Sequence, residues 1–161
     1  MTIKVGDKVP AVKVKQMTPE GMKDIDTGEF FKGKKVVLFA LPGAFTPTCS
    51  AKHLPGFVEK AAEIRGKGVD VIACLSVNDA FVMNAWKRDT DQRDEAIFLA
   101  DGNAEFAKAI GMELDASGNG LGIRSKRYSM LVEDGIVKRL NVEEMPGKVE
   151  VSGADALIAQ L

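Results

Sequence analysis

Two apolar runs, residues 36–41 and 69–75, constrain the fold of this chain more than any other feature. Each run is nearly continuous, which is typical of a strand buried on both faces of a parallel sheet. Between them, residues 50–65 carry apolar side chains at helical spacing and predict an amphipathic helix. Pro55 lies inside this segment, so we expect a kink or an irregular turn near its start. The order strand, helix, strand predicts a βαβ unit.

The remaining residues extend this unit into a mixed α/β sheet with helices on both faces and an antiparallel hairpin at one side. Asp134-Gly135 is a strong turn signal for that hairpin. Residues 112–126 are rich in glycine, serine and charge and predict a loop. The other expected strands are 11–15, 23–25, 97–100, 128–132 and 136–142, and the other expected helices are 80–87, 104–110 and 154–161.

Local signals at two of these helices predict how each one begins. We expect Asn78 or Asp79 to cap the helix at 80–87, and Asn103 to cap the helix at 104–110. The apolar face of the helix at 80–87 is predicted to carry three side chains, Phe81, Val82 and Trp86.

Length and charge bound the class of protein. A chain of 161 residues is long enough for one domain, residues 1–161, that buries its own core. Its formal net charge of −1 gives no reason to expect nucleic acid or an acidic membrane as partner. No apolar run approaches the roughly 20 residues of a membrane span, and the N-terminus lacks the apolar core of a signal peptide. We therefore expect a cytoplasmic protein.

One of the two cysteines occupies a position that favours chemistry. Cys49 lies where the strand at 36–41 gives way to the helix that follows it. A helix N-terminus carries partial positive charge and unpaired N–H groups, which favour a thiolate over a thiol. Because the thiolate is the reactive form, Cys49 is the candidate nucleophile.

The residues around Cys49 match a known motif, Pro42-x3-Thr46-x2-Cys49. The longer stretches 40–50 and 53–57, together with 76–86 and 127–135, resemble the type II (peroxiredoxin-5) subfamily of the peroxiredoxins. Ala80 departs from the usual pattern of the third stretch, standing where proline is common. The resemblance covers nearly the whole chain and implies a thioredoxin-like fold, a thiol peroxidase that needs no cofactor or metal, and a homodimer formed through the segment around 78–86. The apolar residues of that segment are equally explained by packing in the core.

The resemblance gives each motif residue a role that its chemistry suits. Cys49 would attack the peroxide, and the Thr46 hydroxyl, in the same turn, would donate to the thiolate and accept from the peroxide O–H. Pro42 has no N–H and a fixed φ, so it would shape the loop and shield the thiolate from water. Arg127 would reach the pocket if its strand neighbours the strand at 36–41, favouring the thiolate and stabilising the leaving oxygen. The backbone N–H groups of Thr48 and Cys49 would bind the peroxide.

Two assignments have alternatives. Arg124 lies three residues before Arg127 and is the second choice for the cation at the sulfur. His53 lies four residues after Cys49, on the same helical face. It is expected to form hydrogen bonds at the rim of the pocket, and the alternative is a general base, as in a Cys–His hydrolase.

Oxidised Cys49 would be a sulfenic acid that a second thiol must resolve. Cys74 is the only internal candidate, but it lies within an apolar strand, several ångströms from Cys49 along the sheet. We expect Cys74 to be a core thiol, with a resolving role as the alternative. Some relatives carry a resolving cysteine near the C-terminus, whereas residues 149–153 contain none. An external thiol is therefore expected, with glutathione/glutaredoxin ahead of thioredoxin.

The leading functional hypothesis is a thiol peroxidase that reduces hydrogen peroxide and alkyl hydroperoxides. A thioredoxin-type disulfide oxidoreductase should carry Cys-x-x-Cys, but position 46 is threonine. A peroxide-sensing or partner-binding module that does not turn over efficiently would use the same Cys49 chemistry and remains an alternative. Cys49, His53 and Cys74 do not form a dense set of metal ligands.

Overall fold

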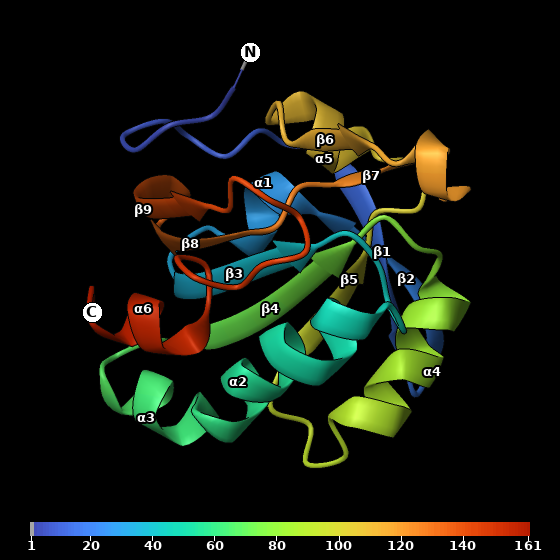
Figure 1. The fold of residues 1–161 in the computed structure, drawn as a ribbon. Coiled ribbons are helices and arrows are strands. Elements are labelled where there is room, and N and C mark those ends of the chain that lie inside the picture. Colours follow the sequence, from blue (N-terminus) through green and yellow to red (C-terminus); the bar gives the residue numbers. More distant parts are fainter. Residues whose placement is uncertain (1) are drawn as a thin grey trace.

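The computed structural model describes residues 2–161, whose main feature is a seven-stranded mixed sheet (Figure 1). The strand order is β2-β1-β5-β4-β3-β8-β9. β3, β4 and β5 are mutually parallel, and the other pairings are antiparallel. The strands are β1 (Lys13–Thr18), β2 (Gly21–Asp26), β3 (Lys35–Leu41), β4 (Val71–Ser76), β5 (Ile97–Ala100), β8 (Tyr128–Glu133) and β9 (Ile136–Val142). The predicted mixed sheet, with its hairpin at one side, is confirmed.

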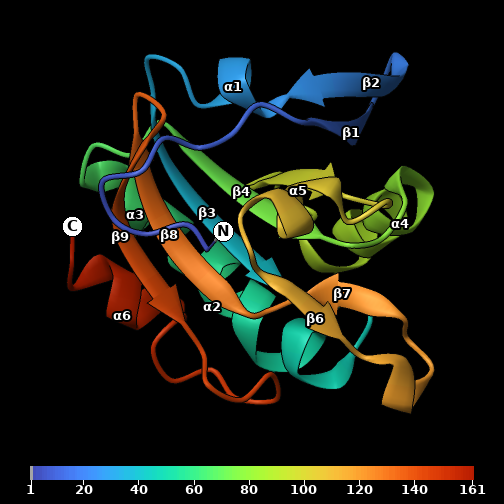
Figure 2. The ribbon, with the colours of Figure 1, turned by 90° about the horizontal axis from the view of Figure 1, so that it is seen from above.

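Helices cover both faces of the sheet, as the sequence predicts (Figures 1 and 2). One face carries η1 (Cys49–His53, a π-helix), α2 (Leu54–Glu59), α3 (Ala61–Gly66), α4 (Ala80–Thr90) and α6 (Ala154–Ile158). The other face carries the short helices α1 (Thr27–Phe30) and α5 (Glu105–Ala109). In the described residues, no helix combines the length and apolar content needed to cross a bilayer.

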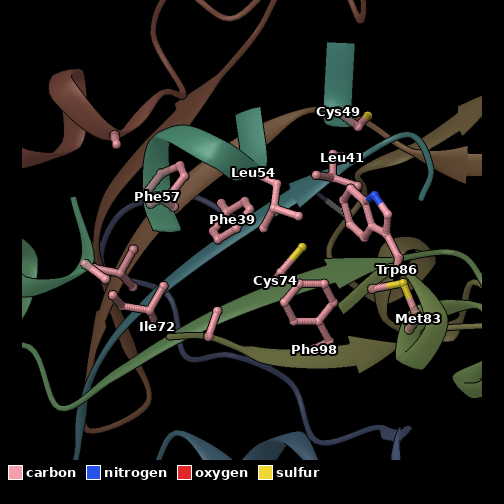
Figure 3. Close-up of a cluster of buried hydrophobic side chains, with 14 of the residues drawn as sticks. Phe39, Leu41, Cys49, Leu54, Phe57, Ile72, Cys74, Met83, Trp86 and Phe98 are labelled. Carbon is pink, nitrogen blue, oxygen red and sulfur yellow. The ribbon is translucent and has the colours of Figure 1, made fainter. Parts of the chain in front are cut away.

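Alternation along β3 divides the core into two clusters. Val37, Phe39 and Leu41 belong to the cluster beneath α2 and α4, whereas the residues between them belong to the cluster on the other face. The Phe39 ring stacks on Phe57 of α2, with ring centroids 4.1 Å apart. Figure 3 shows this first cluster, which lies directly under the helix that begins at Cys49. The apolar runs thus fix β3 and this helix against each other.

The predicted helix from Ser50 to Arg65 is broken into three pieces. Its first turn is the π-helix η1, in which the N–H of Leu54 donates to the carbonyl of Cys49, five residues earlier. Pro55 follows at once and has no N–H to continue the regular pattern. A second break separates α2 from α3 at Lys60, whose φ and ψ are −97° and 9°. The irregularity expected near Pro55 is confirmed, and it lies within one turn of Cys49.

The predicted apolar face of α4 is wrong at Phe81. Phe81 is 66% exposed, whereas Ala80, Met83 and Trp86 form the buried face. These three recur every third residue, so Phe81 lies about 100° away around the helix. The cap is Asp79, whose Oδ1 accepts from the Val82 N–H at 2.8 Å.

Two other expectations differ from the structure. Residues 112–126 form a small hairpin, β6 (Glu113–Asp115) and β7 (Ile123–Ser125), around the 3-10 turn η2 (Ser117–Asn119), where a loop was predicted. Its three-residue strands are too short for a periodic signal.

Asn103 does not cap α5. Instead, the Asp101 carboxylate accepts the N–H groups of Phe106 and Ala107 at 3.1 and 2.9 Å.

Candidate active site

Cys49 is the first residue of η1 and lies at the end of the loop that leaves β3. Its side chain is fully buried. In Figure 3 it lies at the edge of the apolar cluster, above Leu41, whereas Cys74 lies in the middle. The Ser50 hydroxyl, next in the chain, accepts a 3.0 Å hydrogen bond from the Trp86 indole and so ties this helix start to α4.

Arg127 provides the charged partner of the Cys49 sulfur. It immediately precedes β8, which pairs antiparallel with β3 and places Tyr128 opposite Ala40. The Nη2 atom of Arg127 donates to Sγ of Cys49 at 3.1 Å. The arginine is 2% exposed, so water does little to screen its charge. The neighbouring strand predicted from sequence is therefore present, and it brings Arg127 to the sulfur.

Three hydrogen bonds fix the Arg127 guanidinium. Nε donates to the carbonyl of Pro146 at 2.9 Å, Nη1 donates to Nδ1 of His53 at 2.9 Å, and Nη2 donates to the sulfur. A guanidinium has five N–H groups, so within residues 2–161 two of them are left for a ligand. Three partners thus hold the Arg127 guanidinium, and its positive charge lies next to the Cys49 sulfur.

His53 is a neutral acceptor rather than a base. It is fully buried, so its expected place at a pocket rim is wrong. Burial, and then the positive charge of Arg127, lower its pKa from 6.5 to about 3. Nε2 lies 3.0 Å from the carbonyl of Ser152, which can only accept, so Nε2 carries the proton. The lone pair on Nδ1 is used by Arg127, which leaves His53 no free basic nitrogen.

Thr46 does not make the contact that the sequence suggests. Its hydroxyl donates to the carbonyl of Gly43 at 2.6 Å, not to the Cys49 sulfur. This bond closes the turn before the helix, and the Thr46 carbonyl accepts from the Ser50 N–H at 3.0 Å. The hydroxyl oxygen keeps a lone pair that can accept a hydrogen bond from a ligand.

The second-choice cation, Arg124, supports the loop instead of the sulfur. Its Nη1 donates to the carbonyl of Pro42 at 3.2 Å, and its Nε donates to the carbonyl of Leu121 at 3.0 Å. A Cβ on Gly43 would collide with this guanidinium, so a side chain at this position would displace the end of Arg124. Asn78 holds the next residue of the loop, because its Oδ1 accepts from the Ala44 N–H at 3.0 Å.

The backbone N–H groups of Thr48 and Cys49 are available to a ligand. In the described part of the chain, no backbone carbonyl accepts from either of them. Both belong to the first turn of the helix, where N–H groups lack intrahelical partners. The Thr48 hydroxyl donates to the carbonyl of Gly147 at 3.2 Å, which brings the loop after β9 across this helix start.

That loop, residues 143–153, is the part of the site that sequence reasoning missed. It contributes three carbonyls, those of Pro146, Gly147 and Ser152, which accept from Arg127, Thr48 and His53 respectively. Every residue has a backbone carbonyl, so the sequence does not mark these three as functional. They also lie about 100 residues from Cys49 along the chain. Nothing in the residue pattern of the loop indicates its place beside the sulfur.

Cys74 lies inside β4, opposite Phe98 of β5, and is fully buried. Both cysteines are free thiols. Burial, followed by the nearby Cys49, raises the pKa of Cys74 well above its usual value. A thiol in this state is a poor nucleophile.

Among residues 2–161, no group of three or more His, Cys, Asp or Glu side chains is arranged to hold a metal ion.

The chain is similar to proteins of known family. The family described as Redoxin matches residues 4–158. Peroxiredoxin-2E, chloroplastic, of Arabidopsis thaliana is 51% identical over 162 residues, which are 98% of this chain and 69% of the relative. Peroxiredoxin-2B of the same plant is 45% identical over 160 residues, covering 99% and 98%. The crystal structure of reduced Prx3 from Vibrio vulnificus in complex with hydrogen peroxide has a TM-score of 0.94 and 50% identity, and covers 99% of both chains.

The buried neutral His53 predicts acid sensitivity. Its folded-state pKa of about 3 lies below the unfolded value of 6.5, so its contribution to stability is complete above pH 6.5 and is lost as the pH falls toward 3. Between pH 7.5 and pH 5 we expect it to cost about 2 kcal/mol of unfolding free energy. His53 is the only histidine in the chain, so the difference between wild type and His53→Gln in urea unfolding at the two pH values isolates its contribution. His53→Gln should flatten this dependence, and an equal slope in both proteins would contradict the assignment.

Proposed function

The chain belongs to the peroxiredoxin family, and from this premise we propose that Cys49 reduces hydrogen peroxide and alkyl hydroperoxides and is regenerated by an external thiol. Membership of the family makes the protein a thiol-dependent peroxidase with a thioredoxin-like fold. The observation that carries the proposal for this chain is the 3.1 Å contact between Arg127 Nη2 and Cys49 Sγ, buried and fixed on three sides.

The proposed reaction begins with attack of the Cys49 thiolate on one oxygen of the peroxide. A sulfur–oxygen bond forms, the O–O bond breaks, and the other oxygen leaves as hydroxide or alkoxide, which takes up the proton released when the Cys49 thiol ionised and becomes water or an alcohol. The sulfur loses two electrons to the peroxide and becomes a sulfenic acid. Negative charge builds on the leaving oxygen, and the unused N–H groups of Arg127 are positioned to stabilise it.

The groups around the sulfur support binding of a peroxide before attack. The N–H groups of Thr48 and Cys49 are donors, and the Thr46 hydroxyl oxygen is an acceptor for the peroxide O–H. A hydroperoxide offers both kinds of partner on adjacent oxygens. Pro42 is buried in the same loop and offers no competing N–H, so its ring helps keep water from the sulfur.

Regeneration is proposed to proceed through an external thiol. That thiol attacks the sulfenic sulfur and releases water to give a mixed disulfide, and a second thiol then releases Cys49 as a thiol. The full burial and raised pKa of Cys74 support an external route over an internal disulfide. Glutathione with glutaredoxin is placed ahead of thioredoxin as the physiological reductant.

The intact mass of the reduced protein after one equivalent of peroxide tests the first step. We expect a gain of one oxygen atom in the wild type and no change in Cys49→Ser. Loss of two hydrogens instead would mean that Cys74 resolves the sulfenic acid. An unchanged wild-type mass would refute the proposal for Cys49.

Turnover assays with separate reducing systems test the second step. We expect glutathione with glutaredoxin to sustain peroxide consumption at a higher kcat/KM than thioredoxin with its reductase. Cys74→Ser should retain full turnover in the preferred system, because the side chain has only a packing role. Turnover with thioredoxin alone would reverse the proposed order.

A homodimer through the segment around Asn78–Trp86 is also proposed. Phe81 in this segment is 66% exposed, and Phe45 of the active-site loop is 53% exposed, a large apolar area for side chains outside a core. Covering both rings would also restrain the loop that precedes Cys49.

Light scattering at micromolar concentration tests the dimer. We expect the wild type to have twice the 17.3 kDa chain mass and Phe81→Glu to approach the monomer mass, because a charge would be buried in the interface. Val151→Glu is the matched control, since Val151 is 45% exposed elsewhere on the surface. A monomeric wild type, or a dimeric Phe81→Glu, would contradict this interface.

A further inference from the structure

Glu143 is an acidic residue that the peroxide chemistry does not use, yet it is only 8% exposed. Its Oε2 atom accepts four hydrogen bonds from a single segment. The backbone N–H groups of Glu150, Val151 and Ser152 donate at 2.9, 2.9 and 2.7 Å, and the Ser152 hydroxyl donates at 2.6 Å. The carboxylate therefore gathers the far end of the loop at one point.

The backbone of Glu143 fixes the near end of the same loop. Its N–H donates to the carbonyl of Arg127 at 3.0 Å, so Glu143 is joined directly to the residue whose guanidinium lies on the sulfur. Both ends of residues 144–152 thus meet at Glu143. The loop between them is closed by one side chain.

The closed loop supports two of the three contacts that fix Arg127, one directly and one through His53. The carbonyl of Pro146 accepts from Nε of Arg127. The carbonyl of Ser152 accepts from Nε2 of His53, which leaves Nδ1 of His53 free to accept from Nη1 of Arg127. The Ser152 N–H and the Ser152 carbonyl belong to one residue, so the bond to Glu143 and the bond to His53 are mechanically linked.

We propose that Glu143 is a positioning residue for peroxide reduction, which closes the loop at 144–152 so that its carbonyls hold Arg127, directly and through His53, against Cys49. This inference rests on the role proposed above for Cys49. Glu143 touches neither the sulfur nor Arg127's guanidinium, and it acts through two backbone carbonyls and a neutral imidazole.

The charge of Glu143 matters to this role. Burial raises the pKa of its carboxyl, but the Ser152 hydroxyl and the three N–H groups outweigh burial and hold the pKa below its usual value. A carboxylate accepts such bonds more strongly than a neutral oxygen does. An amide in its place presents only a neutral acceptor to the same four donors, so the loop should be held less firmly at this point.

The test is a double-mutant cycle on the rate of Cys49 oxidation. Glu143→Gln and Arg127→Gln are made singly and together, and single-turnover oxidation by hydrogen peroxide is followed by intact mass. In the wild-type background we expect Glu143→Gln to slow oxidation about 10- to 100-fold, the usual effect of displacing a catalytic group through its support. In the Arg127→Gln background we expect a change of less than about 2-fold, because there is no guanidinium left to position.

Glu20 supplies the matched control. It lies in the turn between β1 and β2, is exposed and carries the same charge, so Glu20→Gln should leave the oxidation rate unchanged. Equal slowing by Glu20→Gln and Glu143→Gln would mean that net charge, not the loop closure, sets the rate. An equal effect of Glu143→Gln in both Arg127 backgrounds would show a general structural role, and no effect at all would remove the proposal.

Ser152→Ala covers the case in which Glu143→Gln does not fold. It removes one of the four bonds to Glu143 and keeps the carbonyl that accepts from His53. We expect Ser152→Ala to slow Cys49 oxidation by a smaller factor than Glu143→Gln does, and this effect should also disappear in the Arg127→Gln background. An equal decrease in the oxidation rate in that background would overturn the proposal. Wild-type protein that fails to oxidise would instead refute the role of Cys49, so the two failures are distinguishable.

Discussion

The contact between the Arg127 guanidinium and the Cys49 sulfur is the interaction on which the rest of the site depends. Neither group is in contact with bulk water. The electrostatic attraction between them is therefore strong, and the free-energy cost of removing them from water is high. A buried guanidinium needs partners for its N–H groups, and here a backbone carbonyl, an imidazole and the sulfur each accept from one of them. Pairing of β8 with β3 brings the arginine into place, and the helix that starts at Cys49 brings the sulfur.

The two cysteines have the same side chain but different environments, and this difference separates the proposed nucleophile from the core thiol. Cys49 begins a helix beside a fixed cation, whereas Cys74 lies in the middle of β4 among apolar side chains (Figure 3). Burial, and then the nearby Cys49, raise the pKa of Cys74 well above its usual value and keep it protonated. The two residues belong to the same apolar cluster, so the difference arises within one region of the core.

The strands and most helices were predictable because long apolar runs and turn signals encode them locally, whereas the choice of Arg127 depended on the resemblance of its strand to that of the peroxiredoxins. The hairpin at 113–125 was missed because its strands have three residues each, and Phe81 was misplaced because a short helix allows more than one apolar face. The site was harder to predict. The Thr46 hydroxyl binds its own turn, and His53 is buried rather than at a rim. The loop at 143–153 acts through backbone carbonyls, which carry no side-chain signature.

A neutral group beside Arg127 has a specific advantage over a charged one. A carboxylate in the place of His53 would form a stronger bond to the guanidinium, but it would also compete with the thiolate for the same positive charge. The imidazole accepts from Nη1 without a negative charge, because its pKa of about 3 keeps it unprotonated. The nearby acid, Glu143, is kept off the guanidinium and connects to it through Ser152 and His53. The full charge of Arg127 thus remains for the sulfur and, in the proposed reaction, for the leaving oxygen of the peroxide.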